Sequence, residues 1–259
     1  MDSNHVQERT TIPASTASFE RPLQDVLDRL PAPQAFRQQI RAQRAGTIAG
    51  PREDDSEHQK QISRNLKLLS ADLGRRYAAD RVTLENFEIY HGSQRPVISQ
   101  LERFREGLKA GNKEIGNLIF FGSAGVGKDH LLASLLYSAV HRGITARWIS
   151  GAELFGKLRD AIDSRKSEAD TLREFAEANI LAISDPCPEV GELSAWNVTQ
   201  LTRLVDRRYR AMQATWLAMN CTDGAEAESR LTVPLFDRLR DSATVVRCFW
   251  PSYRQRRTA

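Results

Sequence analysis

The sequence lacks long apolar runs, a secretory signal and any strong excess of one charge. No segment contains about eighteen consecutive apolar residues, which argues against a membrane-spanning helix. The first residues, Met-Asp-Ser-Asn-His, lack the basic and apolar regions of a signal peptide. The net charge is only +4 over 259 residues, so the chain is no polycation, although an anionic partner is compatible with this charge. Together these absences predict a protein of the cytoplasm.

Cysteine is scarce, and its distribution argues against a disulfide framework or a cysteine-based metal site. Cys187, Cys221 and Cys248 are widely spaced, odd in number and outside any paired metal-ligand motif. Such residues are typical of small buried side chains in a reduced compartment. The chain also has no internal repeat, and its length allows one substantial core with an extension.

Residues 117–136 carry the strongest functional signal. The apolar stretch Asn117–Phe121 predicts a buried strand, and an apolar pattern at helical spacing follows a glycine-rich loop. Gly122, Gly127 and Lys128 fit the first seven positions of the phosphate-binding pattern Gly-x-x-x-x-Gly-Lys-[Ser/Thr]. Glycine lets backbone N–H groups surround phosphate oxygens, the helix N-terminus adds partial positive charge, and the lysine adds a full one. A simple strand-to-helix turn needs glycine but not this lysine, so the sequence predicts nucleotide binding.

The predicted nucleotide contacts are the loop and the start of the helix after it: Gly122, Ser123, Ala124, Gly125, Val126, Gly127, Lys128, Asp129 and His130. The eighth position of the pattern is normally a hydroxyl residue, and here it is Asp129.

The chain divides into three parts. Residues 1–58 are rich in Pro, Ser, Thr, Gln and charge, which predicts a poorly ordered arm; a short amphipathic helix over 23–30 is the alternative. Residues 59–81 predict a helical lead-in, with a helix over 59–77. Residues 82–259 predict the nucleotide-binding domain. The stretch 81–90, which overlaps its start, is either a strand or an extended lead-in.

Beyond the lead-in the pattern alternates between helix and strand. Further strands are predicted over 145–149, 180–183, 215–220 and 243–249, and helices from Pro96, from Ala152 to about Glu177, over 198–212 and around 235–239. This alternation predicts an α/β fold: a five-stranded parallel sheet with helices on both faces.

Polar residues at the ends of two apolar strands are candidates to complete the site. A bound nucleoside triphosphate carries Mg²⁺, which prefers hard oxygen ligands, and hydrolysis needs a group that orients water. Ser184 and Asp185 follow one strand, and Asn220 ends another. Both places have a simpler interpretation, because Asp185-Pro186 is also a turn signal and Asn220 can cap a turn.

Four segments resemble the AAA+ ATPases of the DnaC/IstB type, which include helicase loaders and transposition helper ATPases. They are Gly-Ser-Ala-Gly-Val-Gly-Lys-Asp-His-Leu at 122–131, Ile-Leu-Ala-Ile-Ser-Asp at 180–185, Leu-Phe-Asp-Arg-Leu at 235–239 and Trp-Pro-Ser-Tyr-Arg at 250–254. The resemblance extends from about Val82 to Arg254. Its last two segments are more specific than the phosphate loop, which occurs in many families.

The resemblance implies roles for three residues. Arg238 matches the arginine that reaches into the nucleotide of a neighbouring subunit, and Arg254 the arginine that senses nucleotide from the C-terminal side of its own subunit. Asn220 matches the polar residue on the strand between the phosphate-loop strand and the acidic strand. Arginine suits both of its roles because it stays charged and offers a planar fork to phosphate oxygens. For Arg238, a surface salt bridge on a charged helix is an equal alternative.

The resemblance also implies a function. The implied function is that of an AAA+ accessory protein that binds ATP and Mg²⁺, hydrolyses ATP and acts on DNA in replication or transposition. The implied partners are DNA (single-stranded or a transposition target), a helicase or transposase client, and further copies of the chain in an ATP-dependent homo-oligomer. Lys157, Arg159, Arg165 and Lys166 are candidate DNA contacts because relatives carry DNA-facing helices there; a solvated surface is the alternative.

Two departures from the family pattern bear on hydrolysis. Asp129 replaces the magnesium-binding Ser or Thr, and the acidic pair reads Ser184-Asp185, or Asp185-Pro186 with the register shifted by one. One hypothesis is an exchange: the loop supplies a carboxylate, the strand supplies a hydroxyl, and Asp185 orients the attacking water. The rival is a nucleotide-responsive adaptor that does not hydrolyse ATP. A small-molecule phosphotransferase is a third candidate, but it leaves the segments at 235–239 and 250–254 unexplained.

Overall fold

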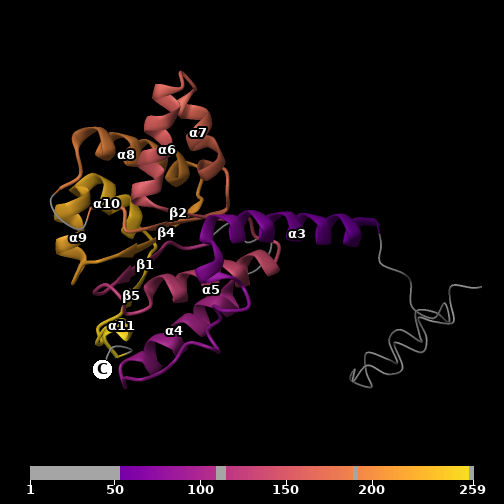
Figure 1. Ribbon diagram of the computed structural model, residues 1–259, viewed down its shortest axis with the longest axis vertical. Helices are drawn as coiled ribbons and strands as arrows, with labels where there is room; N and C mark the ends of the chain where they lie inside the picture. Colours follow the sequence, from indigo (N-terminus) through magenta and orange to yellow (C-terminus); the bar gives the residue numbers. More distant parts are fainter. Residues whose placement is uncertain (1–52, 109–114, 189–191, 257–259) are drawn as a thin grey trace, which may run out of the picture. The chain divides into compact units, whose positions relative to one another are not determined.

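The computed structural model describes residues 53–108, 115–188 and 192–256 (Figure 1). Residues 1–52 of the predicted arm, and with them the alternative helix over 23–30, lie outside these ranges. None of the helices in the described ranges combines the length and apolar character needed to span a bilayer.

A parallel sheet organises the fold. Its strands are β1 (Leu118–Phe121), β2 (Ala146–Ser150), β3 (Ile180–Ser184), β4 (Ala214–Met219) and β5 (Thr244–Arg247). The order is β2-β3-β4-β1-β5, and every pairing is parallel. The five predicted strands are confirmed, with ends shifted by one or two residues. Because β4 lies between β1 and β3, the carboxyl ends of these three strands meet at one edge of the sheet.

Helices cover both faces of the sheet, as predicted (Figure 1). One face packs against α3 (Glu53–Leu73), α4 (Gln94–Gly107) and α5 (Lys128–His141). The other packs against α6 (Gly151–Asp163), α7 (Glu168–Ala176), α8 (Ala195–Arg210), α9 (Gly224–Leu231) and α10 (Val233–Arg240). Alternate strand residues point to opposite faces, so Phe120 and Trp216 belong to the first core and Phe121 and Leu217 to the second.

Some predicted elements differ in detail. The helix predicted to begin at Gln59 begins at Glu53, and the 3-10 turn η1 (Arg75–Tyr77) follows its end. The segment 81–90 contains no strand, so the extended lead-in is the correct alternative. The helical stretch predicted to about Glu177 is two helices, because Arg165 adopts a positive φ of 54° and Ser167 caps a new helix.

Helix α3 is attached to the domain by apolar and polar contacts. Leu69 and Leu73 are buried in the first core. Asp72 accepts two hydrogen bonds from Arg147 of β2, at 2.7 and 3.0 Å. Ser70 Oγ and Tyr137 Oη of α5 are hydrogen-bonded at 3.3 Å. The residues after α3 are thereby brought to the carboxyl edge of the sheet.

Candidate nucleotide-binding site

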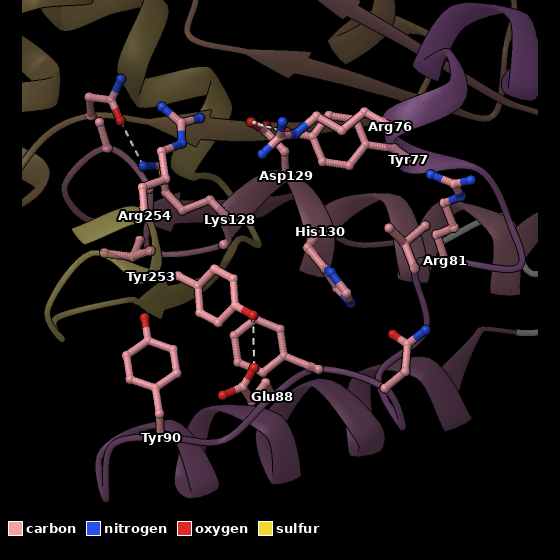
Figure 2. A pocket seen from close by; sticks show the side chains of 18 of the residues that line it. Arg76, Tyr77, Arg81, Glu88, Tyr90, Lys128, Asp129, His130, Tyr253 and Arg254 are labelled. Carbon is pink, nitrogen blue, oxygen red and sulfur yellow. Dashed lines mark hydrogen bonds between the residues drawn. The ribbon is translucent and has the colours of Figure 1, made fainter. Parts of the chain in front are cut away.

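A cavity of about 540 Å³ lies at the carboxyl edge of the sheet (Figure 2). The phosphate loop and the first turn of α5 form one wall, with Asp185 and Asn220 from the ends of neighbouring strands. The opposite walls come from η1, from the segment 81–90, and from Tyr253 and Arg254 of α11 (Tyr253–Arg256). The structure thus brings most of the predicted site residues together around one cavity.

The glycines of the loop are required by its backbone and by close neighbours. Gly125 and Gly127 have φ values of 81° and 98°, which side-chain-bearing residues rarely adopt. A Cβ at Gly127 would lie 2.8 Å from the Phe87 ring, and one at Gly125 would lie 2.2 Å from Ser252 Oγ. The loop therefore needs glycine for its turn and also because the lead-in and the C-terminal segment press against it.

Lys128 is held beneath the loop. Its Nζ donates to Gly122 O at 2.8 Å, to Ser123 O at 2.9 Å and to Asn220 Oδ1 at 2.7 Å. Burial lowers the pKa of Lys128, while the nearby carboxylates of Asp185 and Asp129 oppose that shift. The contact with Asn220 joins Lys128 to the end of strand β4. Strand β4 lies between β1 and β3, where the strand carrying this polar residue was predicted.

Asp129 and Ser184, the two unusual residues, touch each other. Ser184 Oγ donates to Asp129 Oδ1 at 2.5 Å, and the hydroxyl of Tyr77 donates to Oδ2 at 3.5 Å. Ser184 is the last residue of β3, whereas Pro186 packs close to Gly151. The residue opposite Asp129 is therefore Ser184, which agrees with the unshifted register.

Asp185 lines the cavity one residue beyond the strand. It is exposed and has a positive φ of 45°, and its N–H donates to Ala218 O at 2.8 Å. Asp129 and Asp185 both line the cavity, and the Ser184 hydroxyl contacts Asp129, so two carboxylates and one hydroxyl are present in this part of the site. These are hard oxygen donors of the kind that Mg²⁺ prefers, so the residues present fit that ion.

Aromatic residues form the far side of the cavity, and most of them were missed by sequence reasoning. The Phe87 ring is edge-on to His130 with centroids 5.3 Å apart, and Tyr90 packs against Tyr253 at 5.7 Å. Burial lowers the pKa of His130, whose Nε2 lies 3.0 Å from Thr83 O. The sequence carries no signal that the aromatic residues between 77 and 90 return to the phosphate loop, because that return depends on contacts between distant segments.

The C-terminal segment closes over the phosphate loop. Trp250 Nε1 donates to Val126 O at 2.9 Å, and the Tyr253 N–H donates to Gly125 O at 3.0 Å. Arg254 consequently lines the cavity beside Lys128 (Figure 2). A guanidinium in this place faces the same space as the loop, where phosphate oxygens would lie.

Arg238 does not line this cavity. Its Nε pairs with Asp206 of α8 at 2.5 Å, and its Nη1 donates to Pro234 O at 2.7 Å. The carbonyl of Arg238 accepts a hydrogen bond from Asn117, which precedes β1 at the amino edge of the sheet. Arg238 thus lies at the opposite edge of the sheet from the phosphate loop.

The candidate DNA contacts also lie away from the cavity. Lys157 and Arg159 are on α6, and Arg165 and Lys166 are in the exposed turn after it. Arg159 stacks over the Trp196 ring at 5.4 Å and donates to Asn197 Oδ1 at 3.3 Å. Lys157 approaches Glu153 at 3.9 Å.

A family model described as IstB-like ATP binding protein matches residues 79–259. The chain belongs to this family. The predicted resemblance is confirmed, and nucleotide binding agrees with the description of the family.

Curated relatives extend the comparison. The replicative helicase loader DnaC of Buchnera aphidicola subsp. Acyrthosiphon pisum is 26% identical over 178 residues, which cover 67% of this chain and 69% of the relative. DnaC of Escherichia coli K12 is 27% identical over 177 residues, covering 67% and 70%.

Solved structures confirm the α/β fold. The crystal structure of the DnaC helicase loader has a TM-score of 0.59 at 22% identity, covering 67% of this chain and 99% of that chain. The crystal structure of DnaI has a TM-score of 0.57 at 20% identity, covering 73% and 98%.

Proposed function

We propose that this protein binds ATP with Mg²⁺, hydrolyses it, and uses it to load a replicative helicase onto DNA. The single observation that carries the proposal is the cavity where Lys128, Asn220, Asp185 and Arg254 converge on the phosphate loop. Helicase loading is the favoured process because curated relatives are named replicative helicase loaders. Transposition is the other process that the resemblance to proteins of the DnaC/IstB type implies.

The triphosphate would occupy the loop between the start of α5 and α11. Backbone N–H groups of the loop and the N-terminus of α5 attract phosphate oxygens. Lys128 Nζ is bonded to loop carbonyls and to Asn220, and a phosphate oxygen would replace one of these acceptors. Arg254 would contact the same phosphates from its own subunit, and the aromatic residues of 87–90 would border the base.

Asp129 and Ser184 would hold the metal, and Asp185 would orient the attacking water. Bound Mg²⁺ neutralises charge on the β- and γ-phosphates. The hydroxyl of Ser184 donates a hydrogen bond to Asp129 and keeps lone pairs for a cation. The exposed Asp185 carboxylate lies beyond this pair and can accept a proton from water. The predicted exchange of ligand types therefore has a geometry that supports it.

Arg238 would complete the site from a neighbouring subunit. In the free chain its charge is paired with Asp206, and both side chains are about one-third exposed (35%). A surface pair of this kind contributes little to stability, about 0–1 kcal/mol, so a stronger partner such as a phosphate can displace it.

The alternative function is a nucleotide-responsive adaptor without turnover. The carboxylate of Asp129 at the eighth loop position favours it, because an anion beside the phosphates is repulsive unless the metal lies between them.

ATP turnover with and without single-stranded DNA, with oligomeric mass followed in parallel, tests the proposal. We expect turnover and ATP-dependent assembly in the parent chain. Arg238→Ala should bind ATP normally but lose both, whereas Arg240→Ala, its neighbour paired with Asp237 on the same helix, should keep both. Mixing Arg238→Ala with Lys128→Ala should restore some turnover at shared interfaces. ATP binding without turnover would favour the adaptor, and loss of ATP binding in Arg238→Ala would refute its role in a second subunit.

A further inference from the structure

Arg76 and Tyr77 line the nucleotide cavity although they precede the family match, which begins at residue 79. Both belong to η1, the short turn after α3. The Tyr77 hydroxyl donates to Asp129 Oδ2 at 3.5 Å, and Figure 2 shows Tyr77 and Arg76 next to Asp129. One wall of the site, beside a predicted metal ligand, therefore comes from a segment that the family match does not include.

The Asp129 carboxylate is held by one hydroxyl on each oxygen. Ser184 Oγ reaches Oδ1 from β3, and Tyr77 Oη reaches Oδ2 from η1. The χ2 torsion of an aspartate has a broad preference, so a single donor leaves the plane of the carboxylate free to rotate. A second donor from a different element, at the longer distance of 3.5 Å, restricts that rotation. Each oxygen keeps a lone pair, so the tyrosine orients the carboxylate without blocking it.

Tyr77 is itself held in place. Gly74, with a φ of 67°, ends the α-helical path, and the Tyr77 N–H donates to Gly74 O at 3.3 Å. The Tyr77 ring packs against the first core, where Leu69 and Leu73 of α3 are also buried. The hydroxyl therefore cannot follow Asp129 freely, so a movement of Asp129 would break its contact with Tyr77 or displace η1.

The other polar contacts of α3 described above lie outside the cavity. Asp72 is paired with Arg147 of β2, and Ser70 is bonded to Tyr137 of α5. Neither Asp72 nor Ser70 lines the cavity. The contact between Tyr77 and Asp129 is thus a direct link between the nucleotide site and the segment that leads to α3.

We propose that Tyr77 is a positioning residue of the nucleotide site, which orients Asp129 for Mg²⁺-dependent ATP binding and couples occupancy of the site to helix α3. The inference rests on the proposed ATP- and Mg²⁺-binding function. Outer partners that orient a metal-binding group typically contribute about 10- to 100-fold to metal affinity. The contact of Tyr77 is long, so we expect an effect at the lower end of that range.

The test compares Tyr77→Phe with Tyr137→Phe, which removes a hydroxyl contact of α3 outside the cavity. The affinity of each variant for a fluorescent ATP analogue is measured in Mg²⁺ and in EDTA. Tyr77→Phe should reduce the gain in affinity produced by Mg²⁺ about tenfold, with the affinity in EDTA unchanged. Tyr137→Phe should alter neither. Hydrogen exchange of residues 68–77 should slow on addition of Mg²⁺ and ATP in the parent and in Tyr137→Phe, but not in Tyr77→Phe.

The outcomes separate the inference from the function on which it rests. An unchanged Mg²⁺ effect in Tyr77→Phe, with normal binding by the parent, would refute the inference alone. Equal losses in Mg²⁺ and in EDTA would assign Tyr77 a structural role only and would also refute it. No ATP binding by the parent would instead contradict the proposed function.

Discussion

The contact between Asp129 and Ser184 predicts a strong coupling between the two positions. In the parent chain a hydroxyl donates to a carboxylate at 2.5 Å, and Ser184 is only 4% exposed. Asp129→Thr removes the negative charge and leaves two hydroxyls. Ser184→Asp places two carboxylates against each other. The double variant restores one hydroxyl and one carboxylate with the two ends reversed.

The expected magnitudes follow from these contacts. Loss of a hydrogen bond to a charged group costs about 1.5–3 kcal/mol, so Asp129→Thr should lower the free energy of unfolding by about 2 kcal/mol. Two carboxylates about 4 Å apart repel by about 4 kcal/mol at an effective dielectric constant of about 20, which is the expected cost of Ser184→Asp. The double variant regains the charge-assisted bond and should lie within about 1 kcal/mol of the parent. The coupling energy is then about 5 kcal/mol.

Two assays measure this cycle. Urea unfolding at pH 7.5 without nucleotide gives the stability of the four proteins. Titration with a fluorescent ATP analogue, with and without Mg²⁺, gives the metal-dependent part of nucleotide affinity, which should fall in each single variant and recover in the double variant. Contacting residues that share a ligand shell are non-additive. A double variant as impaired as the sum of the single ones, in both assays, would refute the exchange.

Three further predictions concern other parts of the molecule. Arg208 is fully buried, and burial lowers its pKa to about 9, yet it stays charged at pH 7 and donates to main-chain carbonyls around the ends of α7 and β4. Arg208→Met should therefore lower the free energy of unfolding by about 3–5 kcal/mol in urea, and a loss below about 1 kcal/mol would contradict this role. Burial lowers the pKa of His130 from its ordinary value of 6.5. As the pH falls below 6.5, the unfolded chain therefore binds a proton more readily than the folded chain, and the free energy of unfolding should decrease. His130→Gln should reduce the slope of the free energy of unfolding against pH, and the substitution His141→Gln at an exposed position should not; equal slopes in the parent and in His130→Gln would count against this role of His130. Binding to single-stranded DNA should weaken steeply with salt, and Arg159→Ala should reduce the slope of log affinity against log salt by about 1; salt-independent binding would argue for a solvated surface instead.

Local patterns in the sequence predicted the frame of the site. Short apolar segments predicted β1, β3 and β4 because burial on both faces selects continuous apolar residues, and the alternation with helices predicted β2 and β5. The glycines and Lys128 predicted the phosphate loop, and Asn220 was recognisable as a polar residue ending an apolar strand. Parallel strands deliver their carboxyl ends to one edge, so these local signals were enough to place Asn220, Asp185 and the loop together.

Contacts between distant segments could not be predicted in the same way. Tyr77 and Asp129 are 52 residues apart in sequence, and nothing in the pattern around Tyr77 indicates that the end of α3 reaches the loop. The buried Arg208 cannot be told from its exposed arginine neighbours in the sequence, because all its partners except the Thr215 hydroxyl are main-chain carbonyls. The pairing of Arg238 with Asp206 likewise depends on the packing of α10 against α8.

The most direct test of the central claim is calorimetric titration of ATP and Mg²⁺ into the parent chain, Lys128→Ala and Lys157→Ala. Lys128 makes two hydrogen bonds to carbonyls of the loop and one to Asn220, whereas Lys157 has an exposed side chain on α6 outside the cavity. We expect binding by the parent and by Lys157→Ala, and affinity weakened by about 100-fold or more in a folded Lys128→Ala, since charged hydrogen bonds to phosphate are lost. Equal affinity in the parent and in Lys128→Ala would contradict the assignment of this loop as the nucleotide site.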